Sequence, residues 1–143
     1  ILAKYIPVAK DKPDEPSKQE KQQDAPKEQP EYFDAELLSL IHKVCVGEQF
    51  EDIATQDFYA NMNLYSCKKE LKIKAREKIR VCYLIFLMSE RLPKQDRDKW
   101  KNIILKQLDI DENYYKSKYK EPVSDFPSDS NQKFAKEMDA IFR

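Results

Sequence analysis

The chain of 143 residues is long enough for one domain with a hydrophobic core, and its 26 basic and 26 acidic residues cancel to a net charge of zero. This balance excludes a whole-molecule field that would attract nucleic acid or a membrane surface, so such a partner would need a local patch. The single glycine, Gly47, argues against the glycine-rich loops of nucleotide enzymes and against hairpin turns. We therefore predict an all-α fold, a small helical bundle of about four to six helices with a disordered N-terminal tail.

The N-terminal residues differ in composition from the rest of the chain. Residues 9–30 are rich in proline, glutamine and charged residues and contain no aromatic or β-branched side chain. Such a segment cannot bury enough apolar surface to offset the cost of ordering its backbone, which predicts a disordered linker. The apolar segment 1–8 is then predicted to dock through Tyr5, Ile6 and Val8, in a groove of the chain's own domain or of a partner. The alternative is the frayed end of a neighbouring domain.

The helical domain is expected over residues 31–143, with its first helix from Asp34 to Val46. Asp34 is a good N-cap, and Gly47 follows as a C-terminal stop. His42 lies in this helix without a second histidine in the chain, so we expect a surface or partly packed side chain and no metal site. Apolar residues recur at helical spacing and predict the buried face: Phe33, Leu37, Leu40, Ile41 and Val44.

Residues 48–65 have a mixed pattern of apolar and polar positions. Thr55 or Asp57 would cap a short second helix, and the aromatic residues nearby suggest that it packs across the central helix. A strand is less favoured, because Asn61 and Asn63 interrupt the pattern and no hairpin turn follows.

A long helix is predicted from Ser66, as its N-cap, to Leu92. From Val81 to Met88 all eight residues are apolar, which is typical of a helix that neighbours surround on every side. This run is too short to span a bilayer, which takes about 20 residues. The first half of the helix is expected to carry a continuous basic face: Lys69, Lys72, Arg76 and Arg80.

Pro93 suits the start of a further helix that runs to Leu108. Leu92-Pro93, with Arg97 four residues after the proline, then Ile104 and Leu108, resembles the BESS motif, a two-helix interaction module of insect chromatin proteins, over about residues 79–108. The first helix of that family is leucine-rich and follows acidic residues, whereas here it continues a basic helix. The resemblance implies a protein-binding role in a chromatin-associated assembly. The apolar positions that match the first helix of the motif are Val81, Cys82, Tyr83, Ile85 and Phe86, and the inner side of the second is expected to hold Trp100, Ile103, Ile104, Gln107 and Leu108.

The C-terminal part predicts a short tyrosine-containing helix over residues 109–119, a loop over 122–130 and a final helix from Asn131. One face of the final helix is apolar at helical spacing. This face either closes the core or binds a partner, through Phe134, Met138, Ile141 and Phe142.

No set of residues predicts catalysis. The chain contains no nucleophile elbow, no phosphate-binding loop and no paired histidines, and its acidic pairs are those expected in a highly charged sequence. The three cysteines, Cys45, Cys67 and Cys82, lack the paired spacing of a zinc site and are expected to be small buried residues in a reducing compartment. We predict no enzyme activity, no cofactor and no metal.

The sequence therefore favours a protein-protein interaction module, a scaffold or adaptor of an intracellular assembly, in the nucleus more than in the cytoplasm. Its partner is expected to be another protein, or a second copy of the chain that binds through helix faces. Binding to a membrane is not expected. The alternative is a nucleic-acid-binding domain that uses the basic face of the helix over residues 66–92.

Overall fold

The computed structural model describes residues 31–142, and this part of the chain is all-α, as predicted. The segments 1–8 and 9–30, for which docking and disorder are predicted, lie outside the described residues. Only isolated β-bridges, and no sheet, occur in the described part. The helices are α1 Ala35–Cys45, α2 Thr55–Met62, α3 Lys78–Glu90, α4 Lys94–Gln107, α5 Glu112–Lys118, the short 3-10 helix η2 Glu121–Val123 and α6 Asp129–Phe142.

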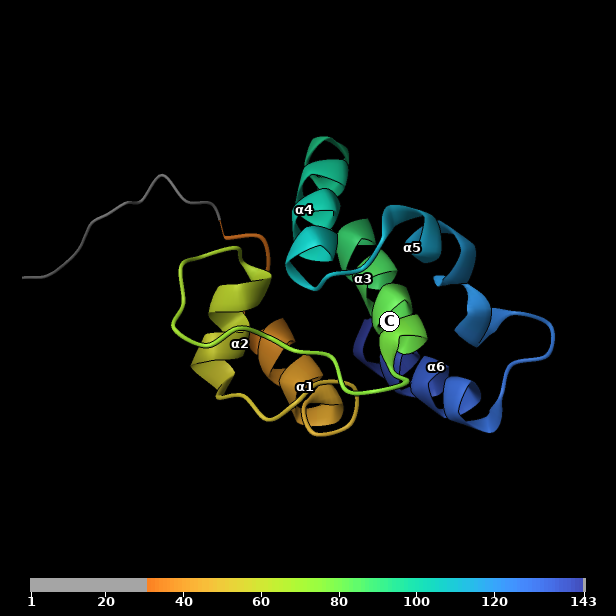
Figure 1. The fold of residues 1–143 in the computed structure, drawn as a ribbon. Helices are drawn as coiled ribbons and strands as arrows, with labels where there is room; N and C mark the ends of the chain where they lie inside the picture. The colour runs from red at the N-terminus through yellow and green to blue at the C-terminus, as the bar shows by residue number, and fades with distance from the viewer. Residues whose placement is uncertain (1–30, 143) are drawn as a thin grey trace, which may run out of the picture. The chain divides into compact units, whose positions relative to one another are not determined.

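Helix α3 lies at the centre of the described domain (Figure 1). It packs against α4, α5, η2 and α6, while α6 also contacts α1, and α1 contacts α2. The run from Val81 to Ile85 is buried without interruption, and only Phe86 and Leu87 are partly exposed in the apolar stretch. The prediction of a central helix covered on nearly every side is thus confirmed.

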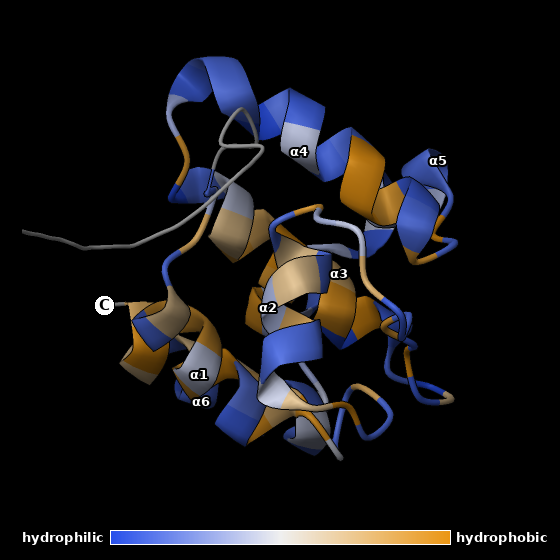
Figure 2. Cartoon of the chain, turned by 90° about the vertical axis from the view of Figure 1, so that its left-hand side faces the viewer, coloured by the Kyte–Doolittle hydropathy of each residue, from blue (hydrophilic) through white to orange (hydrophobic). Residues whose placement is uncertain are grey.

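Local sequence signals set several helix ends as expected. The Asp34 carboxylate accepts a hydrogen bond from the Leu37 N–H at 2.8 Å, which caps α1, and Gly47 follows that helix with a φ of +92°. The helix predicted over residues 109–119 is α5, and its cap, which was not predicted, is Asp111, whose carboxylate accepts from the Asn113 and Tyr114 N–H groups. Proline at position 93 precedes α4, whose colouring in Figure 2 is hydrophilic over much of its length.

The expected helix over residues 66–92 is wrong in its first half. Helix α3 begins only at Lys78, and the chain before it is an extended segment with positive φ values at Leu64 and Arg76. Lys74 N–H donates to the Gln49 carbonyl, and Glu51 N–H donates to the Lys72 carbonyl, both at 2.9 Å. These bonds run to another part of the chain and replace the bonds of a helix.

Two buried asparagines hold the chain near α2: Asn61 holds the segment 64–77, and Asn63 holds the residues before α1. The Asn61 side chain accepts from the Leu71 N–H and donates to the Lys69 carbonyl, so it fixes the segment to α2. Asn63 accepts from the Tyr32 and Phe33 N–H groups and donates to the Phe33 carbonyl, which fixes the start of α1. Lysines at three- and four-residue spacing in the segment 64–77 would also repel one another in a helix.

The helix faces turn slightly away from the predicted ones. In α1, Leu38 is buried and Leu40 is exposed, because α2 and α6 cover the arc that contains Leu38, Ile41 and Cys45. In α4, Leu105 is buried where Ile103 and Gln107 had been expected. Trp100 is fully buried as predicted, and its indole N–H donates to the Met62 carbonyl at 2.8 Å.

Candidate interaction surface

The predicted basic face does not form, because its residues do not share one helix. Lys69 and Lys72 are exposed on the segment 64–77, Arg76 lies in a turn, and only Arg80 is part of α3. The hollow beside these lysines has balanced charges, three lysines against three carboxylates: Lys68, Lys69, Lys72, Glu51, Asp52 and Glu70. A track that follows a phosphate backbone would need an excess of positive charge, which this hollow lacks.

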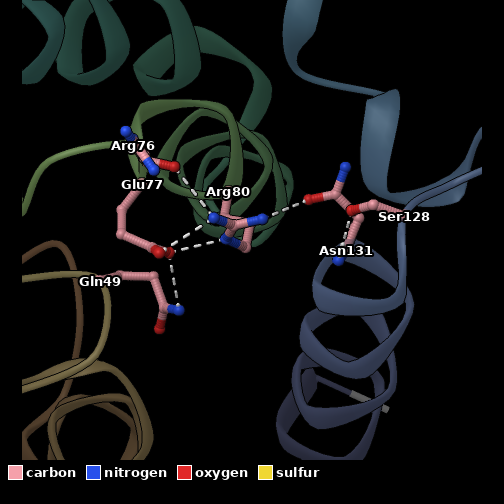
Figure 3. Close-up of polar contacts among 6 residues, drawn as sticks. All are labelled: Gln49, Arg76, Glu77, Arg80, Ser128 and Asn131. Carbon is pink, nitrogen blue, oxygen red and sulfur yellow. Dashed lines mark hydrogen bonds and ion pairs between the residues drawn. The ribbon is translucent and has the colours of Figure 1, made fainter.

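The Arg80 side chain forms hydrogen bonds to other residues of the domain (Figure 3). Its side chain is 14% exposed and holds the Glu77 carboxylate through two hydrogen bonds, at 2.6 and 2.9 Å. It also donates to the Asn131 side-chain oxygen on α6 at 2.8 Å and to the Arg76 carbonyl at 2.9 Å. The guanidinium therefore joins the first turn of α3 to the first turn of α6.

The Glu77 carboxylate is the acidic centre of this network. Burial alone would raise its pKa, but hydrogen bonds from Arg80 and Gln49, with the charges of Arg80 and Lys74, hold the pKa of Glu77 below its ordinary value. The negative form is thus stabilised in the folded chain. These contacts make Arg80 and Glu77 a structural pair, and sequence spacing alone had placed Arg80 on a surface.

The apolar face of α6 mostly closes the core. Phe134 and Met138, predicted as partner-binding residues, are almost completely buried, and Phe134 meets the Tyr83 ring of α3 edge-on. Ile141 and Phe142 are only partly buried at the end of the helix. The third group of predicted partner-binding residues, Tyr5, Ile6 and Val8, lies outside the described residues.

A groove with apolar side chains lies where the start of α1 meets the end of α6. It is an open hollow of about 700 Å³, a volume that includes adjoining solvent, and is called here the α1–α6 groove. Leu40 is 47% exposed at this groove, and the Arg91 guanidinium, which also lines it, lies 5.3 Å from the Phe142 ring centre. Asp34 and Glu36 bring negative charge to the same groove, so charges of both signs line it together with apolar side chains. The lining residues are Tyr32, Phe33, Asp34, Glu36, Leu37, Leu40, Arg91 and Ile141.

A second apolar feature lies on the loop between η2 and α6, and no periodic pattern in the sequence indicates it. Phe126 is 95% exposed and Val123 is 53% exposed. The available signal was an aromatic residue between Asp125 and Pro127, in a polar stretch with no apolar residue three or four positions after it. Such a residue has no helix face to join.

None of the three thiols has the lowered pKa of a reactive cysteine. Cys45 and Cys82 are buried, and burial is the main cause that raises the pKa of each to about 12. Cys67 is exposed, contrary to expectation, and its pKa is also raised, by partial burial and then by Asp57 and Glu70. His42 lies against the Phe58 ring, and its Nε2 is 2.7 Å from the Ile53 carbonyl oxygen.

Among residues 31–142, no three histidine, cysteine or acidic side chains gather as a metal site. No helix in the same range is both long and apolar enough to cross a membrane. Helices α3 and α4, on which the resemblance to the BESS motif rests, pack against each other, and Leu92 between them is buried. Comparison with known proteins adds no relative, since no family model, no curated protein and no solved structure matches the chain.

Proposed function

We propose that this chain is a non-catalytic protein-protein interaction module, a scaffold or adaptor that holds a partner protein in an intracellular assembly. The observation that carries the proposal is the α1–α6 groove. The core of the domain is closed by its own side chains, yet Leu37, Leu40 and Ile141 leave apolar surface around one hollow. A hollow that combines apolar and charged side chains suits a protein partner, because protein interfaces pair apolar contacts with polar ones.

The charges of the groove support a peptide or helix as the occupant. Asp34 and Glu36 lie on the α1 side, and Arg91 follows α3, so a partner segment with apolar side chains flanked by both charge signs would be complementary. A second copy of the chain would bury the same surface and is the rival occupant. The resemblance to the BESS motif supports a nuclear, chromatin-associated setting over a cytoplasmic one.

The nucleic-acid alternative has lost the helical basic face from which it was derived. No other observation in the described part favours it over a protein partner, and it stays an untested prediction.

A photo-crosslinking residue at position 40 of the full chain, expressed in cells, would identify what touches the groove. The cross-linked protein is then purified and titrated with the parent chain and with Leu40→Asp. A charge in an apolar contact should weaken binding by at least about tenfold. Ser39→Asp is the matched control, because it adds the same charge one position along α1, outside the residues that line the groove.

The proposal requires that Leu40→Asp lose affinity while Ser39→Asp does not. Equal binding by the parent and Leu40→Asp would show that the groove holds no partner. A cross-link only to a second copy of the chain would replace the adaptor role with self-association.

A further inference from the structure

The loop of residues 124–128 presents one aromatic side chain to solvent. Phe126 is 95% exposed, in contrast to the other phenylalanines of the described part, which are buried or partly buried. An exposed phenyl ring gains free energy when a partner removes it from water. Val123, 53% exposed at the end of η2, provides a smaller apolar contact on the same part of the chain.

Both ends of this loop are fixed by hydrogen bonds. At the first end, the N–H and the hydroxyl of Ser124 both donate to the Glu121 carbonyl, at 3.1 and 2.7 Å. At the other end, the Asn131 N–H donates to the Ser128 hydroxyl oxygen, and the Gln132 N–H to the Ser128 carbonyl.

Two prolines restrict the same loop further. Pro122, a buried residue of η2, restricts the backbone just before the loop, and Pro127 has a fixed φ and limits the backbone of Phe126 before it. The Gln132 side chain also donates to the Pro127 carbonyl at 3.1 Å. Since the loop is ordered before it meets a partner, little conformational entropy remains to be lost on binding.

The charges beside Phe126 define the chemistry of the partner. Between Lys120 and Lys133 the chain contains acidic residues and no basic residue. Glu121 is paired with Lys118 at 3.1 Å, whereas Asp125 and Asp129, before and after Phe126 in the sequence, are exposed. A complementary surface therefore combines an apolar pocket with a basic rim.

Among the described residues, the pocket between the starts of α1 and α2 does not suit this loop. The pocket between the starts of α1 and α2 is lined by residues such as Leu38, Ala54 and Tyr59, none of them charged. It would accept an apolar side chain but would leave Asp125 and Asp129 without partners.

We propose that the loop of residues 124–128 is a second docking site, separate from the α1–α6 groove. Phe126 enters an apolar pocket of a partner protein, and lysine or arginine side chains on the rim of that pocket face Asp125 and Asp129. The site is independent of the groove, because its residues belong to η2, the loop and the first turn of α6.

The test places the photo-reactive amino acid p-benzoylphenylalanine at position 126 of the full chain in cells, with the same residue at Lys99, an exposed position of α4, as control. We expect one protein that is cross-linked from position 126 and not from position 99. Its cross-linked peptide should border an apolar pocket with basic residues. With that purified protein, Phe126→Ala should weaken binding by at least about tenfold. Asp125→Asn with Asp129→Asn should weaken it less and reduce its dependence on salt.

Leu40→Asp separates this site from the groove. This variant should bind the protein cross-linked from position 126 with the affinity of the parent. If the groove proposal fails, the loss of affinity caused by Phe126→Ala should remain. The inference is overturned if position 126 cross-links only to copies of this chain, or no more than position 99 does. It is also overturned if Phe126→Ala binds with the affinity of the parent. Equal melting temperatures of the parent and Phe126→Ala exclude unfolding as the cause of a loss of affinity.

Discussion

The segment 64–77 and helix α3 are consecutive in sequence but are held by different forces. Helix α3 is covered on nearly every side, so its position depends on many small apolar contacts. The segment 64–77 is mostly exposed, and its position depends on a few hydrogen bonds, chiefly those of the Asn61 side chain to Lys69 and Leu71. A few polar groups therefore decide the path of a segment whose position burial leaves undetermined.

Truncation inside α3 should give the largest loss of stability. Leu84→Ala removes a fully buried side chain and should lower the free energy of unfolding by about 2 to 5 kcal/mol. Leu87→Ala is the matched control, since Leu87 is a partly buried leucine on the same helix. Denaturant unfolding measures both. Equal losses in the two variants would show that α3 is not packed as described.

Removal of the Asn63 side chain should give the next largest loss of stability. Asn63→Ala leaves the Tyr32 and Phe33 N–H groups without their acceptor and should cost about 2 to 4 kcal/mol. Asn102→Ala, at an exposed position of α4, should change stability by no more than about 0.5 kcal/mol. If Asn63→Ala unfolds at the denaturant concentration of the parent, the Asn63 hydrogen bonds do not hold Tyr32 and Phe33 in place.

The boundary between the two regions should be sensitive to acid. The pKa of Glu77 is held below its ordinary value of 4.5, so the unfolded chain takes up a proton there at higher pH than the folded chain. The contribution of Glu77 to stability is therefore complete above pH 4.5 and is lost as the pH falls below that value. The free energies of unfolding of the parent and of Glu77→Gln are measured from neutral pH to about pH 3, and the two values should converge in acid. A constant difference across this range would contradict the pairing with Arg80.

The smallest effects on stability belong to the exposed apolar residues, which support neither region. Leu40→Asp and Phe126→Ala should each change the free energy of unfolding by no more than about 0.5 kcal/mol. A loss above about 1 kcal/mol in either variant would mean that the side chain is part of the core. Thermal unfolding of both variants provides the measurement.

Helix periodicity and capping residues were sufficient to predict most of the fold. Asp34, Gly47 and the apolar run from Val81 identified α1 and the core of α3, because these signals act within one or two turns. The segment 64–77 was mispredicted because its hydrogen bonds run to the Asn61 side chain and to the backbone at Gln49 and Glu51, and helix periodicity does not contain these contacts. The sequence spacing of Arg80 is that of a surface residue. Its side chain instead donates to Asn131 of α6, a contact that only the fold shows.

The candidate sites were less predictable than the fold. Ile141 was identified from the apolar face of α6, but that face could not show that Phe134 and Met138 are buried under α3. Leu40 was assigned to the core because its spacing fits, and its exposure depends on which arc of α1 the other helices cover. Phe126 has no periodicity at all.

The salt dependence of binding tests the proposed interaction role most directly. Binding of the protein cross-linked from position 40 is measured for the parent and Leu40→Asp between about 50 and 200 mM salt. We predict that the parent changes affinity by less than about tenfold across this range, since an apolar contact releases few counterions, and that Leu40→Asp binds more weakly throughout. The contradicting result would be that the parent and Leu40→Asp have the same affinity at every salt concentration and that both affinities fall by about a thousandfold over this range. That result would indicate binding by surface charges and not by an apolar docking groove.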